Sequence, residues 1–452
     1  MKNKIIFLIF SLMLVVIFAV GCNDSGEGDK KVKKTYLNVA VWASNEERAV
    51  LEPLFKKFDE ENPDIQLFVD YIISNQYKNK ILTSLAGGTG PDVFLVYCSL
   101  FSAFQDKNVL YPLEELIAKD PTFKKDDYLE SALNQFSKNG DLYCIPRDML
   151  PISFIAYNKD CFDEKGLPYP TDFMTYPELI DLAQKVGKKN DHQITRFGLY
   201  LVDPESVILS YGGEMVDNVE NPTKGAINDP RIVKGLELYH DMIYKYRISP
   251  TKAEIDAIGQ DTMSMLKSGN IAMFWSGVWT LRSCLENKDE FNFGYVQAPH
   301  QPGVEPRYHQ GGAGYGININ TKHVEESWRM LKFITGYEAQ YAMAECDYLF
   351  PSRKDVLQKL YIDKPKDEYG NRMNMVKAAE YVIPTPKTYI SDKIQAAYGR
   401  DFDNYFLDTQ SLEKTVKNAQ KKVNAVFEEE REKQARREAR KAKREAKRKN
   451  KK

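Results

Sequence analysis

Two tryptophans lie four residues apart in the segment SGNIAMFWSGVW, which covers residues 268–279. Gly269 precedes Trp275, and Gly277 lies between Trp275 and Trp279. Glycine has no side chain, so the backbone there can approach a neighbour closely and leave the faces of nearby rings open. Tryptophan combines an apolar face with a polar edge. The pair therefore either fills a core or forms a wall against which a flat, polar ligand lies.

The sequence lacks several common catalytic motifs. It contains no phosphate-binding loop, no H-E-x-x-H metal motif, no G-x-S-x-G turn and no EF-hand spacing. The five histidines and the five cysteines after residue 22 show no metal-ligand spacing. We therefore expect a binding protein without metal or cofactor, and not an enzyme. A pair of hydrolytic carboxylates stays open as an alternative, because such residues are paired in space and not in sequence.

Aromatic and polar residues lie at the ends of several predicted elements. Trp42 is at the end of the first predicted strand, and Tyr97 follows the buried run VFLV. Ligands of open parallel sheets bind outside the carboxyl ends of the strands, so we expect Trp42 and Tyr97 to meet at one cleft. The other candidates near element ends are Glu46, Ser99, Asp148, Glu205, Trp275 and Trp279.

Alternating strands and helices position these residues. YLNVAVW places Leu37, Val39 and Val41 on one face, which predicts a strand. A helix opened by Ser44, with a kink or restart at Pro53, the strand IQLFV, a helix over about 76–86 and the strand VFLV are expected to follow. This order indicates an α/β fold with a sheet covered by helices. Later helices are predicted at about residues 204–210, 230–246, 258–268, 325–345 and 394–430.

The chain begins with the pattern of a signal peptide. Two lysines precede an apolar run from Ile5 to Val20. The small residues before Cys22 resemble a bacterial lipobox, at which the cysteine is lipidated and becomes the first mature residue. We therefore expect a leader at residues 1–21 and a flexible tether at residues 22–35. A transmembrane anchor is the alternative, although the run has 16 residues and a span needs about 20.

The net charge of -1 hides an asymmetry along the chain. Residues 427–452 hold 13 Lys and Arg against 6 Asp and Glu, whereas residues 22–426 hold 48 against 58. The acidic body argues against nucleic-acid binding, which needs a basic face. The basic tail at 427–452 is expected to be a solvated extension of the last helix, because no apolar stripe could dock it. The functional alternative is electrostatic adhesion to anionic lipid headgroups or wall polymers.

Several ordered blocks of the sequence resemble one family, the bacterial extracellular solute-binding proteins of sugar-importing ABC transporters, which includes maltose-binding protein. The resemblance covers roughly residues 36–400. It is carried by NVAVWASNEERAVLEPLFKKFDEENPDIQ, LTSLAGGTGPDVFLV, GDLYCIPRDMLPISFIAYNKDCFDEKGLPYP, LKSGNIAMFWSGVW and GGAGYGININTKHVEESWRMLKFIT.

The resemblance implies a two-lobe fold of the periplasmic-binding-protein type II. In that fold each lobe is a mixed sheet flanked by helices, and the chain crosses the hinge between them more than once. The implied N-terminal lobe comprises residues 36–145 and 300–350, and the implied C-terminal lobe comprises residues 146–299 and 351–426.

The resemblance also implies ligand roles for residues that match the family's contact regions. A tryptophan two residues after a matching glycine supplies a sugar-stacking ring in relatives, which assigns that role to Trp279. The full implied set is Trp42, Glu46, Tyr97, Ser99, Asp148, Glu205, Trp275, Trp279, Gly312 and Arg353.

The sequence therefore predicts a monomeric receptor, lipid-anchored through Cys22 on the extracytoplasmic face of a bacterial membrane. We expect it to capture a carbohydrate, in particular an oligosaccharide, and to deliver it to the permease of an ABC importer. Its partners would be that sugar, the permease and the membrane, and not nucleic acid. The alternatives are a receptor for a charged small molecule such as a polyamine or peptide, a secreted carbohydrate-active enzyme, and a surface adhesin.

Overall fold

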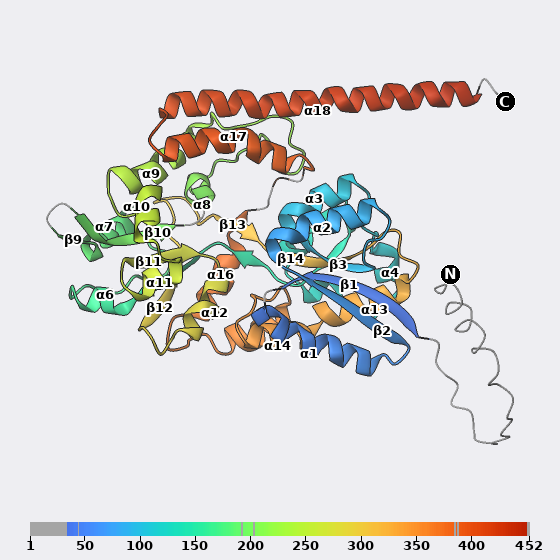
Figure 1. The fold of residues 1–452 in the computed structure, drawn as a ribbon, viewed down its shortest axis with the longest axis horizontal. Coiled ribbons are helices and arrows are strands. Elements are labelled where there is room, and N and C mark those ends of the chain that lie inside the picture. Colours follow the sequence, from blue (N-terminus) through green and yellow to red (C-terminus); the bar gives the residue numbers. More distant parts are fainter. Residues whose placement is uncertain are drawn as a thin grey trace, which may run out of the picture. The chain divides into compact units, whose positions relative to one another are not determined.

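The first sheet has five strands in the order β2-β1-β3-β14-β6 (Figure 1). Strand β1 pairs in parallel with both β2 and β3, whereas β14 pairs antiparallel with β3 and β6. All residues of VFLV are buried, as the unbroken apolar run predicts for a central strand. The strands are β1 (Thr35–Trp42), β2 (Ile65–Ile72), β3 (Val93–Tyr97), β6 (Cys144–Pro146) and β14 (Ala313–Ile317).

This computed structural model describes residues 34–43, 45–190, 193–201, 204–383, 386 and 388–449. Thr35–Lys452 forms one compact unit. The expected leader, Cys22 and nearly all of the expected tether lie outside the described residues, as does the expected helix start at Ser44.

Helices cover the first sheet and join it to the rest of the chain. The helix predicted after the first strand runs from Asn45 to Glu61 without a restart, with Pro53 inside it. The predicted helix over 325–345 is interrupted at Gly336, so that part of the prediction was wrong. The helices here are α1 (Asn45–Glu61), α2 (Ser74–Ala86), α3 (Cys98–Asp106), α4 (Glu114–Lys119), α5 (Glu130–Gln135), α13 (Val324–Thr335) and α14 (Tyr337–Glu345).

The second sheet also has five strands, in the order β12-β8-β11-β10-β9. Strands β10 and β11 are parallel, whereas β8 is antiparallel to β11 and β12. Its strands are β8 (Phe154–Asn158), β9 (Lys188–Asn190), β10 (Gln193–Leu201), β11 (Ile271–Ser276) and β12 (Phe293–Gln297). Its helices are α6 (Lys159–Asp163), α7 (Tyr176–Val186), α8 (Pro204–Leu209), α9 (Pro230–Tyr244), α10 (Lys252–Ile258), α11 (Thr262–Lys267) and α12 (Trp279–Glu286).

A small third sheet, β15-β13-β7, connects the two larger ones. Strand β7 (Leu150–Pro151) lies between β6 and β8 in the chain, and β13 (Tyr308–Gly311) lies between β12 and β14. Strand β15 (Val382–Ile383) supplies the third member. The chain therefore passes repeatedly through this hinge sheet, and the predicted α/β fold of two mixed sheets flanked by helices is confirmed. The exact lobe boundaries stay a prediction.

The C-terminal part contains two helices where one was predicted over 394–430. Helix α17 (Ser391–Phe406) ends before α18 (Leu412–Lys449), and Asp408 in the connection has a φ of 56°. The helix predicted over about 258–268 corresponds to α11, which begins four residues later, at Thr262. The remaining helices are α15 (Lys354–Leu357) and α16 (Arg372–Glu380), with a short π-helical turn at Gln358–Ile362 between them.

Two helical glycines allow a matched test of packing. A methyl group at Gly235 in α9 would lie 2.3 Å from the backbone oxygen of Ile208 in α8, whereas nothing lies within 4 Å of the same position at Gly399 in α17. We expect Gly235→Ala to lower the free energy of unfolding by about 1–3 kcal/mol. Gly399→Ala should raise it by about 0.5–1 kcal/mol, because alanine restricts the unfolded chain. Urea unfolding of both variants checks this; equal effects would contradict the close contact of α8 and α9.

Candidate functional site

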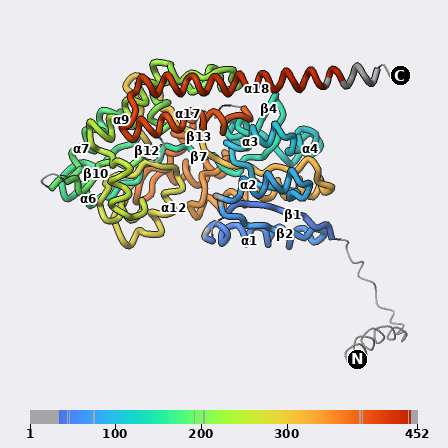
Figure 2. Tube along the Cα trace, turned by 45° about the horizontal axis from the view of Figure 1, so that its top comes forward, coloured from blue at the N-terminus to red at the C-terminus, as the bar shows by residue number. Residues whose placement is uncertain are grey.

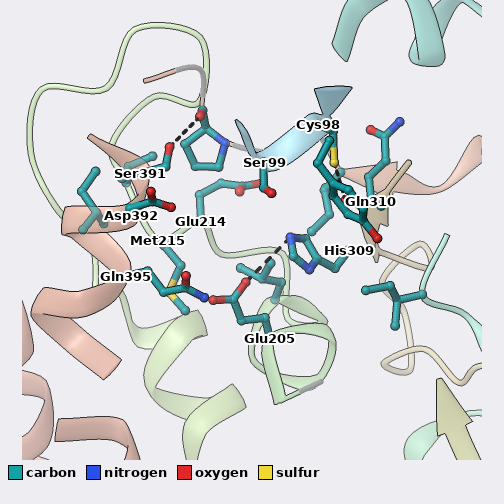
Figure 3. Close-up of a pocket in the computed structure, with 18 of the residues that line it drawn as sticks. Cys98, Ser99, Glu205, Glu214, Met215, His309, Gln310, Ser391, Asp392 and Gln395 are labelled. Carbon is teal, nitrogen blue, oxygen red and sulfur yellow. Dashed lines mark hydrogen bonds and ion pairs between the residues drawn. The ribbon is translucent and has the colours of Figure 1, made fainter. Parts of the chain in front are cut away.

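A cleft of about 260 Å³ lies where the two large sheets and the hinge sheet meet α17. Its size is near the lower end of small-molecule pockets, which hold about 300–1,000 Å³. The end of β3 and the start of α3 supply Tyr97, Cys98 and Ser99. Strand β13 supplies His309, Gln310 and Gly311. Figure 3 shows the side chains of Cys98, Ser99, His309 and Gln310 together with Glu205, Glu214 and the start of α17. Of the residues predicted for ligand contact, Tyr97, Ser99, Glu205 and Trp279 line this cleft.

Tyr97 and Trp42 meet at the carboxyl edge of the first sheet, as the parallel strand order predicts. Their ring centroids are 4.4 Å apart, and the Trp42 ring also meets Tyr77 edge-on at 5.3 Å. Tyr97 is 37% exposed, whereas Trp42 is 8% exposed and does not line the cleft. Trp42 therefore packs against Tyr97 from behind, and its predicted contact with the ligand stays a prediction.

Trp279 is the second exposed aromatic residue that lines the cleft. It begins α12 and is 44% exposed. Its ring lies directly over Gly277, where an added methyl group would be 1.9 Å from Cζ3 of the indole. A side chain at residue 277 would displace the indole ring of Trp279, so the ring can take this position only because residue 277 is glycine. Gly269 has no such role, because it makes a left-handed turn beside Cys161 and Arg196.

Trp275 is a core residue, and its predicted role in ligand stacking was wrong. It is 1% exposed on β11, and its indole N–H donates to the backbone oxygen of Ile152 at 3.1 Å. The ring centroid of Tyr176 lies 6.1 Å away. Side chains alternate between the faces of a strand, so Trp275 points into the packed layer beneath the sheet while Trp279 starts the following helix.

An acidic group, Glu205, faces the imidazole of His309 across the cleft. The Glu205 carboxylate accepts a short hydrogen bond from the Tyr398 hydroxyl, and the nearest His309 nitrogen is 3.8 Å away (Figure 3). The three side chains come from α8, α17 and β13, which are far apart in sequence. The group can therefore accept and donate hydrogen bonds at the rim of a hydroxylated or amino-bearing ligand.

Two further carboxylates, Glu214 and Asp392, line the cleft together with cationic partners outside it. Arg307 donates to Glu214, and Lys78 on α2 pairs with Asp392 on α17. Burial raises the pKa of Glu214, and the Arg307 guanidinium opposes that shift. The Lys78–Asp392 pair joins α17 to a helix of the first sheet.

Asp148 and Gly312 form part of the hinge and do not line the cleft, contrary to their predicted ligand roles. Asp148 is 0% exposed; its carboxylate accepts from Nε of Arg147 at 2.6 Å and from the backbone N–H of Ala313 at 2.7 Å. Although desolvation opposes its charge, the pKa of Arg147 is held well above its usual value by the Asp148 carboxylate. Gly312 has a φ of 135°, and an added methyl group would lie 3.0 Å from the Asp148 backbone oxygen.

Arg353 was also predicted to contact ligand, and it lies elsewhere. Its guanidinium pairs with Asp127 at 3.1 Å and Asp355 at 2.7 Å, and it lies over the ring of Tyr128 at 5.1 Å. These contacts tie the start of α15 to the first part of the chain. Glu46 lies in α1, and its side chain lies outside the described part of the structure, so its role stays a prediction.

Sequence reasoning missed several residues that line the cleft. His309 and Gln310 directly precede the glycine-rich segment GGAGYG, and Glu214 directly follows Gly212 and Gly213. Position beside glycine-rich turns was therefore the available signal. No comparable signal marks the residues of α17. In the sequence of this long polar helix, the positions that line the cleft look the same as the positions that face solvent. The missed residues include Glu214, Met215, His309, Gln310, Asp392, Gln395 and Tyr398.

The cleft contains no arrangement typical of a metal centre. Across the described ranges, no group of three or more His, Cys, Asp or Glu side chains could hold a metal ion. None of the helices in those ranges is long and apolar enough to cross a membrane. No disulfide joins any two of the five described cysteines.

Comparisons with known proteins agree with the fold. A family model described as bacterial extracellular solute-binding protein matches residues 53–370, more than half of the chain. An ABC transporter extracellular-binding protein of Pyrococcus horikoshii is 23% identical over 78% of this chain and 80% of its own. An arabinooligosaccharide-binding protein of Bacillus subtilis is 23% identical over 75% of this chain and 77% of its own.

Solved structures share this fold. An ABC substrate-binding protein from Listeria monocytogenes, solved with cycloalternan, superposes with a TM-score of 0.76 at 23% identity. The match covers 87% of this chain and 99% of that one. The resemblance found in the sequence is thereby confirmed: the chain belongs to the family of bacterial extracellular solute-binding proteins, which serve ABC transporters by binding solutes and are not enzymes.

Proposed function

We propose that this protein captures an oligosaccharide in the cleft between its two large sheets and delivers it to the permease of an ABC importer. The observation that carries the proposal is the pair of exposed aromatic side chains, Tyr97 at the end of β3 and Trp279 at the start of α12, which line one cleft. A sugar ring has faces of C–H groups that stack on aromatic rings and a rim of hydroxyls that needs polar partners. Glu205, His309 and Gln310 supply such partners.

The relatives support the same class of ligand. The Bacillus subtilis relative carries the name arabinooligosaccharide-binding protein, and the Listeria monocytogenes structure holds cycloalternan. Apolar cleft residues such as Leu209, Met215 and Val216 would contact the C–H faces.

The proposed mechanism is closure of the two lobes around the sugar. A ligand that contacts residues from both sheets favours the closed arrangement by its differential affinity for that state. The Lys78–Asp392 pair would form part of the closed side, because it links α2 to α17. The permease would recognise the closed state, and no bond of the ligand would be made or broken.

We also propose that Cys22 carries a lipid that holds the protein at the extracytoplasmic face of the cell membrane. The support is the apolar run before Cys22 and the small residues at its end. Mass spectrometry of the mature N-terminus tests this proposal, and an unmodified chain that still contains residues 1–21 would contradict it.

One observation favours a second candidate, a receptor for a cationic small molecule such as a polyamine. Three carboxylates, those of Glu205, Glu214 and Asp392, line the cleft. Two of them already have cationic partners, Arg307 and Lys78. The remaining negative charge is small, so the saccharide is the better supported ligand.

A thermal-shift screen separates these candidates. We expect members of a panel of oligosaccharides to raise the melting temperature of the mature protein, because a ligand that binds only the native state stabilises it by mass action, by about 2.7 kcal/mol at a concentration of 100 Kd. The panel also includes monosaccharides, polyamines and short peptides. A rise with polyamines alone would favour the cationic ligand, and sugar products after long incubation would favour an enzyme.

A further inference from the structure

The second half of α18 leaves the body of the protein and continues as an exposed helix (Figures 1 and 2). Its first half packs through the buried residues Ala419, Val423 and Phe427 against α17 and neighbouring loops. The last buried contact is Glu430, which accepts hydrogen bonds from Tyr389 and Lys393. Beyond it, the described side chains are exposed apart from a half-buried Lys433.

The charges of this segment, residues 431–449, are strongly unequal and lie on separate faces. It contains eleven Lys and Arg and three Glu. At about 100° per residue, the nine cations from residue 433 to residue 448 fall within about 160° of the helix circumference. The three glutamates and all four alanines fall outside this arc. We call the arc the basic face; Lys433, Arg436, Arg437, Arg440 and Lys443 mark its described part.

Little of this charge is neutralised within the protein. Lys433 pairs with Glu429, and Arg436 pairs with Glu432 one turn earlier. Among the described residues, the structure shows no ion pair for Arg437, Arg440 or Lys443. Pairs between exposed residues four apart in a helix contribute little, so the basic face keeps most of its charge for an external partner.

The chemistry of the segment selects the class of partner. Alanine is the only apolar residue type in it, so it has no stripe that could insert into a bilayer core or form a buried protein interface. A straight face of nineteen residues, about 28 Å long, instead suits a flat anionic surface. The family is extracellular and serves ABC transporters, whose permeases lie in the lipid membrane, so that membrane is the flat surface next to the receptor's partner.

We propose that the basic face of α18 binds the anionic phospholipid headgroups of the membrane and so orients the receptor on it. Residues 22–426 carry ten more acidic than basic residues, and an anionic membrane repels such a body. The basic face therefore determines which side of the molecule lies against the lipid. The inference goes beyond solute capture and does not depend on the identity of the solute.

The proposal is tested with the mature chain, residues 22–452, carrying Cys22→Ser so that no lipid anchor contributes. Binding is measured by sedimentation with vesicles of phosphatidylcholine and phosphatidylglycerol at a 3:1 ratio, and with pure phosphatidylcholine. Each cation near an anionic surface contributes about a fivefold gain in binding. Neutralising five of them should weaken binding at least tenfold after screening by salt. The test variant combines Lys433→Gln, Arg436→Gln, Arg437→Gln, Arg440→Gln and Lys443→Gln.

A matched control removes the same charge from exposed lysines of the body. Their side chains are 56–78% exposed, and their neutralisation should change vesicle binding less than threefold. The control combines Lys56→Gln, Lys119→Gln, Lys185→Gln, Lys245→Gln and Lys252→Gln.

Three results would overturn the proposal: equal binding of the test variant and the parent, equal weakening by the control, or equal binding to pure phosphatidylcholine. A chain ending at Glu430 gives a second test, because it keeps the buried contacts of α18 and should lose the vesicle binding too. An unchanged melting temperature shows that both altered proteins are folded. Retention by soluble polyphosphate without vesicle binding would also overturn the membrane as partner.

Discussion

Replacing Trp279 by alanine is expected to weaken oligosaccharide binding at least tenfold, which corresponds to about 1.4 kcal/mol. The side chain is 44% exposed and lies at the cleft, so the change removes a contact surface without opening a core. Aromatic residues that meet a ligand in such positions carry a large share of the binding energy. Isothermal titration with the sugar found in the thermal-shift screen measures the effect.

The control for this prediction is Tyr337→Ala, which removes another exposed aromatic ring, 41% exposed on α14 and absent from the cleft lining. We expect that variant to bind within twofold of the parent. Gly277→Ala should resemble Trp279→Ala, because its methyl group would displace the indole. Unaltered affinity of Trp279→Ala would remove this residue from the site and leave the proposed stacking without support.

The sequence predicted the parts of the fold that depend on local pattern. Period-two alternation and the run VFLV identified β1 and β3, and their parallel pairing brought Trp42 and Tyr97 together. The predicted boundaries of helices in polar regions were less accurate, because the helical pattern of the sequence continues across the point where one helix ends and the next begins. The break between α17 and α18 contains Asp408 with positive φ, which a propensity argument does not detect.

The individual roles of site residues were harder to predict than the fold. Trp275 and Trp279 are four residues apart, yet a change from strand to helix buries one ring and exposes the other. Asp148 matched a family contact region, but its carboxylate accepts hydrogen bonds from Arg147 and from the backbone N–H of Ala313. Tyr398 and Asp392 reach the cleft only because α17 packs over it, a long-range contact that no local pattern encodes.

Asp148→Asn is expected to lower the free energy of unfolding by about 3–5 kcal/mol, because it leaves the buried guanidinium of Arg147 without a counter-charge. Both side chains are buried, and asparagine can still accept the hydrogen bond from Ala313 N–H. Because asparagine has nearly the same shape as aspartate, the loss of stability measures the effect of removing the negative charge. Urea unfolding measures it as a lower midpoint with an unchanged slope.

The same variant decides between a structural and a ligand-binding role for this carboxylate. Asp148 has no exposed surface, so the folded variant should bind the sugar within threefold of the parent at low temperature. Asp181→Asn is the matched control for stability. The Asp181 side chain is 61% exposed and pairs with Lys185, so the loss of its charge should shift the urea midpoint little. A variant as stable as the parent that loses sugar affinity would instead place Asp148 in contact with ligand, through a hinge movement that exposes it.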